Sequence, residues 1–262
     1  MDLQLKDKRV LITGGSKGIG LAVAKAFAAE GAHLVLCART LAPLVKAGKE
    51  IEKEYNIEVD CQQTDVVDAI SVTVLVEHIK ITYGTLDIFV NNAGQGSEET
   101  IAEAPDERWQ YYWDLHVMAA VRITRGIIPL MNSGGAMLFN SSICAKQPLS
   151  YEPIYNTTKA ALSMFSKCLS SELIPKDIRV NTINPGLVLT PDWYNTATSL
   201  GEKEGITADQ YLDRLAKKLT PIGRFGTPEE IANFFVFLCS PMASYSVGST
   251  YYVDGGWLKV VQ

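Results

Sequence analysis

The chain has 262 residues, of which 47% are hydrophobic and 20% are charged, and its formal net charge is −5. This length and composition predict a globular protein with a large core, and the acidic balance argues against a nucleic-acid or anionic-membrane partner. The sequence contains no run of about 20 apolar residues that could cross a membrane and no apolar signal segment at its start, so we expect no membrane association.

Short apolar runs rich in β-branched residues alternate with segments of helical periodicity. The predicted strands are residues 10–13, 34–37, 59–62, 86–91, 136–141, 180–183 and 250–253. The predicted helices are residues 18–30, 41–55, 68–83, 106–131, 155–173 and 228–239. Strands this uniformly apolar are covered on both faces, and strict alternation predicts right-handed crossovers. We therefore expect one α/β domain over residues 1–262, with a doubly wound parallel sheet of about seven strands and helices on both faces.

A polar insertion at about residues 191–221 separates the sixth predicted strand from the last predicted helix. It carries Trp193 and Tyr194 and contains the helix-like piece ADQYLDRLAKKL. Long excursions from a compact domain often cover a binding site, so we expect a substrate lid here. A surface helical hairpin is the alternative for its distal half.

A glycine-rich turn, TGGSKGIG, follows the first predicted strand. Glycines at this place permit a tight turn and a close backbone approach, and the following helix N-terminus attracts the charge of a pyrophosphate. The spacing matches neither the common G-x-G-x-x-G fingerprint nor a phosphate loop ending in Gly-Lys-Ser/Thr. Its position still predicts a dinucleotide cofactor. The expected cofactor-binding residues are Gly14, Ser16, Lys17, Gly18, Ile19 and Gly20.

The second predicted strand ends in LVLCART, where the adenosine ribose is expected to lie. A carboxylate there would bind both ribose hydroxyls and repel a 2′-phosphate, but Ala38 occupies the position and Arg39 follows. Lys17 projects toward the same region, and an arginine fork suits a phosphate. We therefore expect NADP(H), with NAD(H) as the alternative; an ordinary exposed arginine is the competing interpretation. Asp65 is placed to meet the adenine amino group, or else to cap a nearby helix.

Five ordered motifs resemble those of the short-chain dehydrogenase/reductase family. They are TGGSKGIG, NNAG at 91–94, Ser142, YNTTK at 155–159 and NPGLVLT at 184–190, and a family-like VDGG follows at 253–256. This resemblance covers nearly the whole chain and implies a Rossmann-type domain, a nicotinamide cofactor and reversible hydride transfer between an alcohol and a carbonyl. The further cofactor contacts that it implies are Asn91, Ala93, Gly94, Pro185, Gly186, Val188 and Thr190.

Tyr155 and Lys159 could supply the acid–base group that carbonyl reduction requires. Reduction adds hydride to carbon and a proton to oxygen, yet a phenol with a pKa of about 10 is a poor acid at neutral pH. Lys159 follows one helical turn later, and its charge should stabilise phenolate and lower the tyrosine pKa. The resemblance adds a hydrogen bond from Lys159 to the nicotinamide ribose and gives Ser142 the role of holding the substrate oxygen. A buried tyrosine and a solvated lysine are the structural alternative.

Other nucleophiles near Ser142 do not fit a hydrolase. Neither Ser141 nor Ser142 lies in a G-x-S-x-G elbow, and strand alternation directs their side chains oppositely. Cys144 lacks an activating histidine, so we expect it to line the pocket of a moderately hydrophobic carbonyl or alcohol substrate, together with Gln95 and Trp193. The five cysteines form no CxxC pair and only three histidines occur, so we expect reduced thiols, a cytoplasmic protein and no metal site.

The predicted helix at 106–131 departs from the family pattern at one position. The family places an asparagine there, which holds a water linking the lysine to solvent, whereas alignment on Thr124 and Pro129 puts His116 at that position. Imidazole donates and accepts hydrogen bonds and can titrate near neutrality, so we hypothesise that His116 performs an equivalent proton relay. A packed histidine, with the relay running through backbone and water, is the alternative.

The resemblance also implies an assembly and leaves three functions to compare. Apolar stripes on the segments 106–131 and 155–173 would form the interfaces of a homotetramer, with a dimer as the alternative. The expected function is an NADP(H)-dependent oxidoreductase; the rivals are a related enzyme, such as an enoyl reductase or a halohydrin dehalogenase, and a nucleotide sensor without turnover. The Tyr–Lys spacing and the glycine turn argue against the related enzymes, and retention of both Tyr155 and Lys159 argues against the sensor.

Overall fold

Seven parallel strands in the order β3-β2-β1-β4-β5-β6-β7 form the centre of the computed structural model, which describes residues 1–97, 99–149 and 152–260. The strands are β1 (Arg9–Thr13), β2 (His33–Ala38), β3 (Val59–Gln63), β4 (Leu86–Asn91), β5 (Met131–Asn140), β6 (Arg179–Pro185) and β7 (Thr250–Val253). The seven predicted strands are confirmed, although β5 begins at Met131 rather than at residue 136. Chain order reverses between β1 and β4, and in such sheets a crevice opens at the carboxyl ends of the strands.

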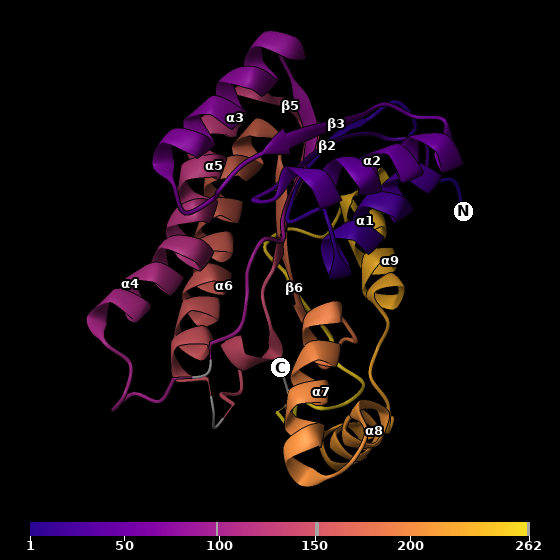
Figure 1. Cartoon of the computed structure of the whole chain (residues 1–262). Coiled ribbons are helices and arrows are strands. Elements are labelled where there is room, and N and C mark those ends of the chain that lie inside the picture. Colours follow the sequence, from indigo (N-terminus) through magenta and orange to yellow (C-terminus); the bar gives the residue numbers. More distant parts are fainter. Residues whose placement is uncertain (98, 150–151, 261–262) are drawn as a thin grey trace.

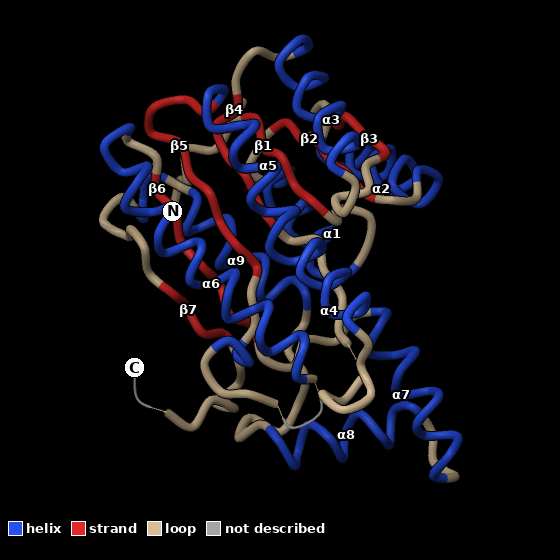
Figure 2. Tube along the Cα trace, turned by 90° about the vertical axis from the view of Figure 1, so that its left-hand side faces the viewer, coloured by secondary structure: helices blue, strands red, loops and turns tan. Residues whose placement is uncertain are grey.

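Helices cover both faces of this sheet within one domain (Figure 1). One face carries α1 (Gly18–Ala29), α2 (Leu41–Tyr55) and α9 (Pro228–Cys239), and the other carries α3 (Ala69–Thr82), α4 (Asp106–Trp113), α5 (Ala119–Ile127) and α6 (Pro153–Leu173). Beyond the end of β6, α7 (Pro191–Glu204) and α8 (Ala208–Leu219) form a helical hairpin (Figures 1 and 2). No helix in the described part of the chain is long and apolar enough to span a membrane.

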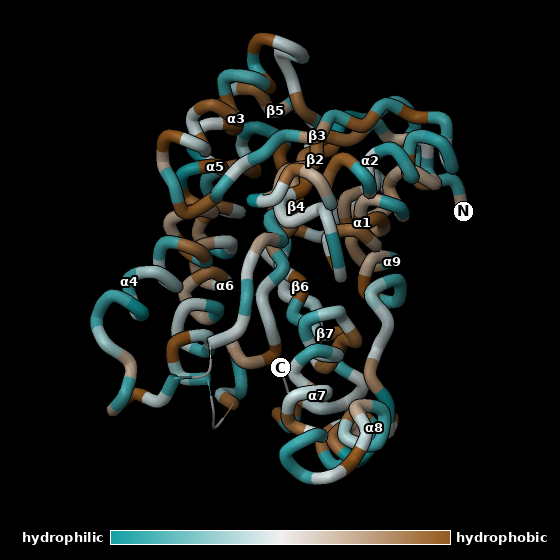
Figure 3. The backbone as a smooth tube through the Cα atoms, viewed as in Figure 1, coloured by the Kyte–Doolittle hydropathy of each residue, from teal (hydrophilic) through white to brown (hydrophobic). Residues whose placement is uncertain are grey.

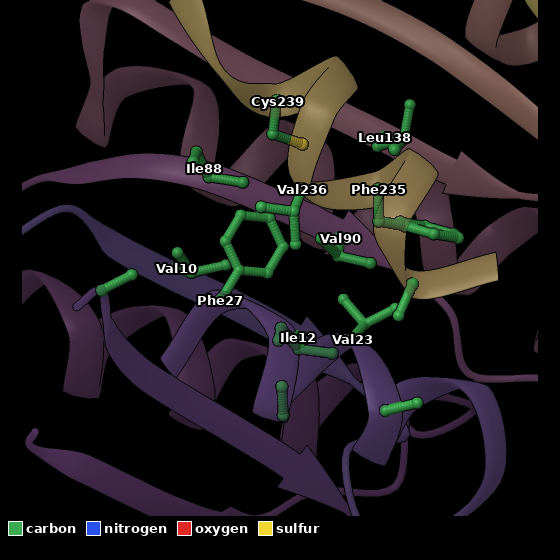
Figure 4. Packing of buried hydrophobic residues seen from close by; sticks show 14 of the residues in the cluster. Val10, Ile12, Val23, Phe27, Ile88, Val90, Leu138, Phe235, Val236 and Cys239 are labelled. Carbon is green, nitrogen blue, oxygen red and sulfur yellow. The ribbon is translucent and has the colours of Figure 1, made fainter. Parts of the chain in front are cut away.

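Alternation along β1 divides the core between the two faces. Val10 and Ile12 pack on the side of α1 and α9, where Phe27 lies between β1 and Val236 (Figure 4), whereas Leu11 faces the opposite cluster. Phe27 is fully buried, and burial of a side chain of this size stabilises the fold by about 1.5–3 kcal/mol. Because β1 and α1 flank the glycine turn, this packing fixes the two ends of that turn.

The predicted helix at 106–131 is not continuous. It is divided into α4, a π-helical turn (Asp114–Met118), α5 and a short 3-10 turn (Ile128–Leu130). Pro129 explains why the helix ends, because its ring lacks an N–H and clashes with helical backbone before it. The π turn inserts an extra residue into the helical ladder, as such turns often do near functional sites. It places His116 against α6.

The α7–α8 hairpin has its own small core. Hydrophobic and hydrophilic residues alternate along it (Figure 3), and its apolar side packs with segments from elsewhere in the chain. The buried members of this cluster are Ile143, Leu187, Ala197, Leu212, Ala216, Phe225 and Trp257. The sequence predicted the helix of α8 but not that of α7. A helical hairpin is present, but it takes up the whole insertion, and the distal half for which it was the alternative is the single helix α8. The role of this insertion as a substrate lid stays a prediction.

Candidate active site

A cleft of about 1140 Å³ opens at the carboxyl ends of the strands, between the glycine turn, the start of α6 and the α7–α8 hairpin. This is the crevice that the reversal of strand order predicts. The predicted site residues that line it are Gly14, Ser16, Lys17, Gly18, Ile19, Gly20, Arg39, Ala93, Gly94, Gln95, Ser142, Tyr155, Lys159, Pro185, Gly186, Val188, Thr190 and Trp193. The fold thus brings residues from distant motifs to one concave surface.

The predicted acid–base pair, Tyr155 and Lys159, lies on the first turns of α6. Pro153 is the first residue of this helix, a place where the missing N–H of proline costs nothing. The Lys159 Nζ donates to the Asn140 carbonyl oxygen at 2.9 Å and lies 5.4 Å from the centre of the Tyr155 ring. Burial lowers the pKa of Lys159 to about 8. The ammonium group is therefore held close to the phenol at the end of β5.

Ser142 and its neighbour have different partners. Ser141 Oγ donates to the Lys159 carbonyl oxygen at 2.9 Å, so it supports α6. Ser142 Oγ accepts from the Cys144 amide at 3.3 Å, and Ser142 is among the residues that line the cleft together with Tyr155. This arrangement follows from strand alternation, which separates the two hydroxyls. Ser142 is the one suited to hold a substrate oxygen.

His116 lies behind the acid–base pair and is 1% exposed. Its ring lies between those of Tyr112 and Tyr155, with centroid separations of 5.7 and 5.5 Å. Its Nδ1 is 2.8 Å from Thr158 Oγ1, and its Nε2 accepts from the Gln95 amide at 3.4 Å. Burial, and then the positive charge of Lys159, hold the pKa of His116 well below its usual range. The expectation that this imidazole titrates near neutrality is therefore wrong.

The glycine turn is shaped for close contact. A Cβ on Gly20 would lie 2.2 Å from the Gly14 carbonyl oxygen, so only glycine fits where α1 meets the turn. Asn92 Nδ2 donates to the Thr13 carbonyl oxygen at 2.9 Å, and its Oδ1 accepts from Asn140, which ties the turn to β5. Among the residues that the structure describes, no side chain caps the first turn of α1. Its amide groups can therefore bind a pyrophosphate.

The two cations expected near the 2′-phosphate both line the cleft, and each has a side-chain partner. Arg39 Nη1 donates to the Tyr111 hydroxyl at 3.4 Å, and Lys17 Nζ forms an ion pair with Asp192 Oδ1 at 2.6 Å. Asp192 belongs to the first turn of α7. The side chains of Lys17 and Asp192 are 59% and 63% exposed, so solvent can compete for this ion pair.

Three predicted binding residues are not among those lining the cleft. Asp65 Oδ1 accepts from the Val67 amide at 3.1 Å, while the cap of α3 is Asp68, so the contact of Asp65 with adenine stays a prediction. Asn91 is buried at the end of β4. Cys144 is also buried, which raises the pKa of its thiol to about 11, so the expectation that it lines the pocket is wrong. The 3-10 turn after Ser142 directs it inward.

Several residues that line the cleft were absent from the predicted site. They include Glu152, Tyr211, Leu215 and Trp257. Glu152 precedes Pro153 at the start of α6, three positions before Tyr155, and this spacing could have identified it. The α8 residues and Trp257 reach the cleft only through tertiary packing. The described residues contain no group of three His, Cys, Asp or Glu side chains that could hold a metal ion.

Comparison with known proteins shows the family. A family model described as Enoyl-(Acyl carrier protein) reductase matches residues 14–258. The solved structure of a short-chain type dehydrogenase/reductase from Mycobacterium marinum is 27% identical, covers 99% of this chain and 98% of that one, and superposes with a TM-score of 0.85. The L-xylulose reductase of Bos taurus is 32% identical over 98% of this chain and 99% of that protein.

This chain belongs to the short-chain dehydrogenase/reductase family. Enzymes of this family are NAD(P)-dependent oxidoreductases, and so is this protein. L-Sorbose reductase from Gluconobacter frateurii, solved in complex with NADPH and L-sorbose, is similar throughout: 54% identity, complete coverage of both chains (100% each) and a TM-score of 0.98.

Proposed function

We propose that this short-chain dehydrogenase/reductase is an NADP(H)-dependent reductase that interconverts a ketose and the corresponding polyol. The observation that carries the proposal is the likeness to L-sorbose reductase over the whole of both chains, at 54% identity. The L-xylulose reductase among its relatives also has a ketose in its name. We therefore take L-sorbose as the probe substrate.

The cleft fits a dinucleotide with a 2′-phosphate. Gly20 allows the backbone of the turn to come close to a pyrophosphate, and the uncapped start of α1 offers amide donors, both within the described residues. Arg39 and Lys17 line the end where the adenosine ribose would lie, and the residue before Arg39 is Ala38 rather than a carboxylate. When bound, the nicotinamide ring supplies or accepts the hydride.

Tyr155, Lys159 and Ser142 together transfer the proton to or from the substrate oxygen. In reduction, the Ser142 hydroxyl holds the substrate oxygen, and the Tyr155 hydroxyl donates its proton to that oxygen. The Lys159 ammonium, 5.4 Å from the ring centre, stabilises the phenolate that remains. In the oxidative direction, Tyr155 accepts the proton from the alcohol. His116 and the Asn140 carbonyl hold this arrangement from behind.

A carboxylate on the cleft wall supports a polyhydroxylated substrate. Glu152 lines the cleft, and its Oε1 is 3.1 Å from the place that a Cβ on Gly96 would occupy. An ionised carboxylate accepts hydrogen bonds from two or more hydroxyls, which a simple ketone lacks. This proposal replaces the earlier expectation of a moderately hydrophobic substrate.

The α7–α8 hairpin would act as the lid over this substrate. Asp192 and Trp193 of α7 and Tyr211 of α8 line the cleft. The Trp193 ring packs edge-on against Phe225 at 5.5 Å, which anchors the start of the hairpin. The part of the insertion proposed to cover the substrate is therefore residues 191–221.

We also propose a homotetramer, with a dimer as the alternative, located in the cytoplasm. Large apolar side chains are exposed on two helices: Met164 on α6, and Phe234 and Phe237 on α9. A second copy of the chain would cover them. All five cysteines are free thiols, which suits a reducing compartment. Light scattering after size-exclusion chromatography measures the mass directly, and a monomer would contradict the assembly.

The function is tested by following nicotinamide absorbance with NADPH or NADH and a panel of acceptors. The panel contains L-sorbose, L-xylulose, an unsubstituted cyclic ketone, a 3-oxoacyl thioester and an enoyl thioester. We expect the highest kcat/KM with NADPH and a ketose, and oxidation of a hexitol by NADP⁺ in reverse. Turnover of only the thioesters or only the unsubstituted ketone would contradict the proposed ketose substrate. Tight NADPH binding without turnover of any acceptor would favour a nucleotide sensor.

The cofactor preference has a separate test in Arg39→Ala. Loss of a charge-assisted hydrogen bond to the 2′-phosphate should lower the NADPH-to-NADH preference by about tenfold or more. Arg125→Ala, at an exposed arginine on α5, is the matched control for a general loss of positive charge. An unchanged preference in Arg39→Ala would contradict the phosphate contact.

A further inference from the structure

Thr158 lies inside the YNTTK motif, between Tyr155 and Lys159, and contacts neither the cleft nor solvent. Its side chain faces the ring of His116, with Oγ1 2.8 Å from Nδ1. The same hydroxyl donates to the Ile154 carbonyl oxygen at 3.0 Å, one turn back along α6. Thr158 therefore joins the π turn that carries His116 to the helix that carries the acid–base pair.

The hydrogen-bond roles around this ring can be assigned from the groups that have only one role. The Gln95 backbone amide can only donate, so His116 Nε2, 3.4 Å away, is the acceptor. A neutral imidazole carries one proton, which must then be on Nδ1 and donated to Thr158 Oγ1. The hydroxyl hydrogen of Thr158 is directed to backbone carbonyl oxygens of α6, those of Ile154 at 3.0 Å and Tyr155 at 3.2 Å. Each of these atoms then has a partner of the opposite kind.

We propose that Thr158 is a positioning residue that fixes His116 as the Nδ1–H tautomer, so that the Nε2 lone pair faces the Gln95 amide and the Lys159 side of the cleft. The inference rests on the proposed reductase function, because it gives Thr158 a part in arranging that acid–base pair. The Nε2 and Lys159 Nζ both lie close to Gly94: a Cβ there would be 3.2 Å from the one and 3.6 Å from the other.

This arrangement changes the role predicted for His116. A relay through the ring would accept a proton at Nε2 and release it from Nδ1, but Nδ1 faces only the buried Thr158 hydroxyl. The hydrogen of that hydroxyl is held by a carbonyl oxygen, which cannot pass on a proton. A proton path through the His116 ring would therefore end at the buried Thr158 hydroxyl and would not reach solvent. His116 therefore serves as a fixed neutral acceptor behind Lys159: the Gln95 amide requires a lone pair on Nε2, and Thr158 accepts the proton that remains on Nδ1.

The tautomer can be measured without any substrate. The chain has three histidines, so solid-state nitrogen NMR of enzyme labelled with ¹⁵N at histidine Nδ1 contains three ring signals, and His116→Asn identifies the one from His116. We expect that signal to show a protonated Nδ1 at neutral pH and labelling at Nε2 to show an unprotonated nitrogen. A protonated Nε2, whether from the other tautomer or from imidazolium, would overturn the proposal.

Three variants then test the part played by the hydroxyl. Thr158→Val removes it at nearly constant shape, Thr158→Ser keeps it, and Thr157→Val is the matched control. The exposed Thr157 makes the same bond to a carbonyl four residues back, at 2.8 Å to Pro153, but faces solvent. We expect the single protonated Nδ1 signal to disappear in Thr158→Val. We also expect its kcat for L-sorbose to fall about tenfold, which is the usual effect of losing one hydrogen bond. Thr158→Ser and Thr157→Val should keep both.

The outcomes separate the two proposals. An unchanged tautomer and kcat in Thr158→Val, or a loss of both in Thr158→Ser, would overturn the role of Thr158. If Thr158→Val does not fold, the wild-type spectrum and Thr158→Ser still decide. The predicted spectrum in an enzyme that reduces no ketose would contradict the proposed function alone.

Discussion

Two regions face each other across the cleft and differ in how their polar groups are held. The proposed catalytic residues Ser142, Tyr155, Lys159 and His116, called the catalytic wall below, are largely buried: His116 is 1% and Lys159 3% exposed, and both have hydrogen-bond partners. The α7–α8 hairpin is attached through its apolar cluster and the exposed Lys17–Asp192 ion pair.

This difference in burial indicates that the catalytic wall and the α7–α8 hairpin have different functions. Buried and satisfied polar groups have one geometry, which acid–base chemistry requires. Exposed ion pairs contribute little to stability and exchange readily with solvent, which suits the role of a lid proposed for the hairpin. Changes in the catalytic wall should therefore act on kcat, and changes in the hairpin should act on binding.

Tyr155→Phe should give the largest effect, because it removes the proton donor and leaves the ring in place. We expect kcat to fall about 10²- to 10⁴-fold, the usual range for loss of a positioned acid. The Kd for NADPH, measured by fluorescence titration, should change by less than about twofold. A loss of kcat below tenfold would mean that another group supplies the proton and that the catalytic wall is wrongly assigned.

Lys159→Met should lower kcat strongly and yet stabilise the protein. The pKa of Lys159 is lowered from 10.5 to about 8 by burial, so the unfolded chain holds more protons between these values. The free energy of unfolding of the wild type therefore rises with pH across that window. At pH 7 the buried ammonium destabilises the fold, and the variant should be more stable by about 2 kcal/mol.

Denaturant unfolding at neutral and at alkaline pH measures this difference. The gap between Lys159→Met and wild type should narrow as the pH rises from about 8 toward 10.5. Lys167→Met, at an exposed lysine of the same helix, is the control and should show no such narrowing. A variant less stable than wild type at both pH values would contradict the buried-charge account.

Glu152→Gln tests the proposed contact between the cleft and the substrate hydroxyls, and we expect an intermediate effect. The amide keeps the shape but loses the charge that binds hydroxyls, so kcat/KM for L-sorbose should fall about tenfold. The plain cyclic ketone has no hydroxyls for Glu152 to bind, and its slow turnover should be unchanged. An equal loss with both substrates would show that Glu152 supports the fold rather than the ketose.

Asp192→Asn should have the smallest effect and should act on binding. It releases Lys17 from an exposed ion pair, which leaves the ammonium free for a 2′-phosphate. We expect NADPH to bind about two- to threefold more tightly, with kcat changed less than twofold. NADH lacks the phosphate, so its Kd serves as the control. A large loss of kcat would show that the ion pair positions the chemistry and would remove the distinction between the two regions.

The inner strands β1, β2, β4 and β6 were predictable because each is a short run buried on both faces, which leaves a clear pattern. The edge strands β3 and β7 contain no buried residue, and their place in the alternation of strands and helices predicted them. The helix break before α5 was not predictable, because the apolar periodicity of the sequence continues through the π turn that carries His116. Helix α7 was not predicted because its segment, PDWYNTATSLGEKE, lacks an apolar periodicity. The segment is mostly polar, and only Ala197 and Gly201 are buried. Its position depends on contact with α8, which no local pattern records.

Motifs located most of the site, but side-chain direction and protonation needed the structure. Cys144 follows Ser142 by two residues, yet the 3-10 turn between them sends its thiol inward. The charge state of His116 depends on burial and on Lys159, which lies 43 positions along the chain (159 − 116). Thr158 lies within the motif itself, and only its contact with His116 gives it a role.

Transfer of deuterium tests the central claim most directly. NADPH carrying deuterium at the transferable position of the nicotinamide is incubated with L-sorbose and the enzyme, and the hexitol product is examined by mass spectrometry. We predict a hexitol with a single deuterium on the former carbonyl carbon, formed by the wild type and reduced to background in Tyr155→Phe. Absence of labelled hexitol from the wild type, or equal labelling by Tyr155→Phe, would contradict a ketose reductase that uses this catalytic wall.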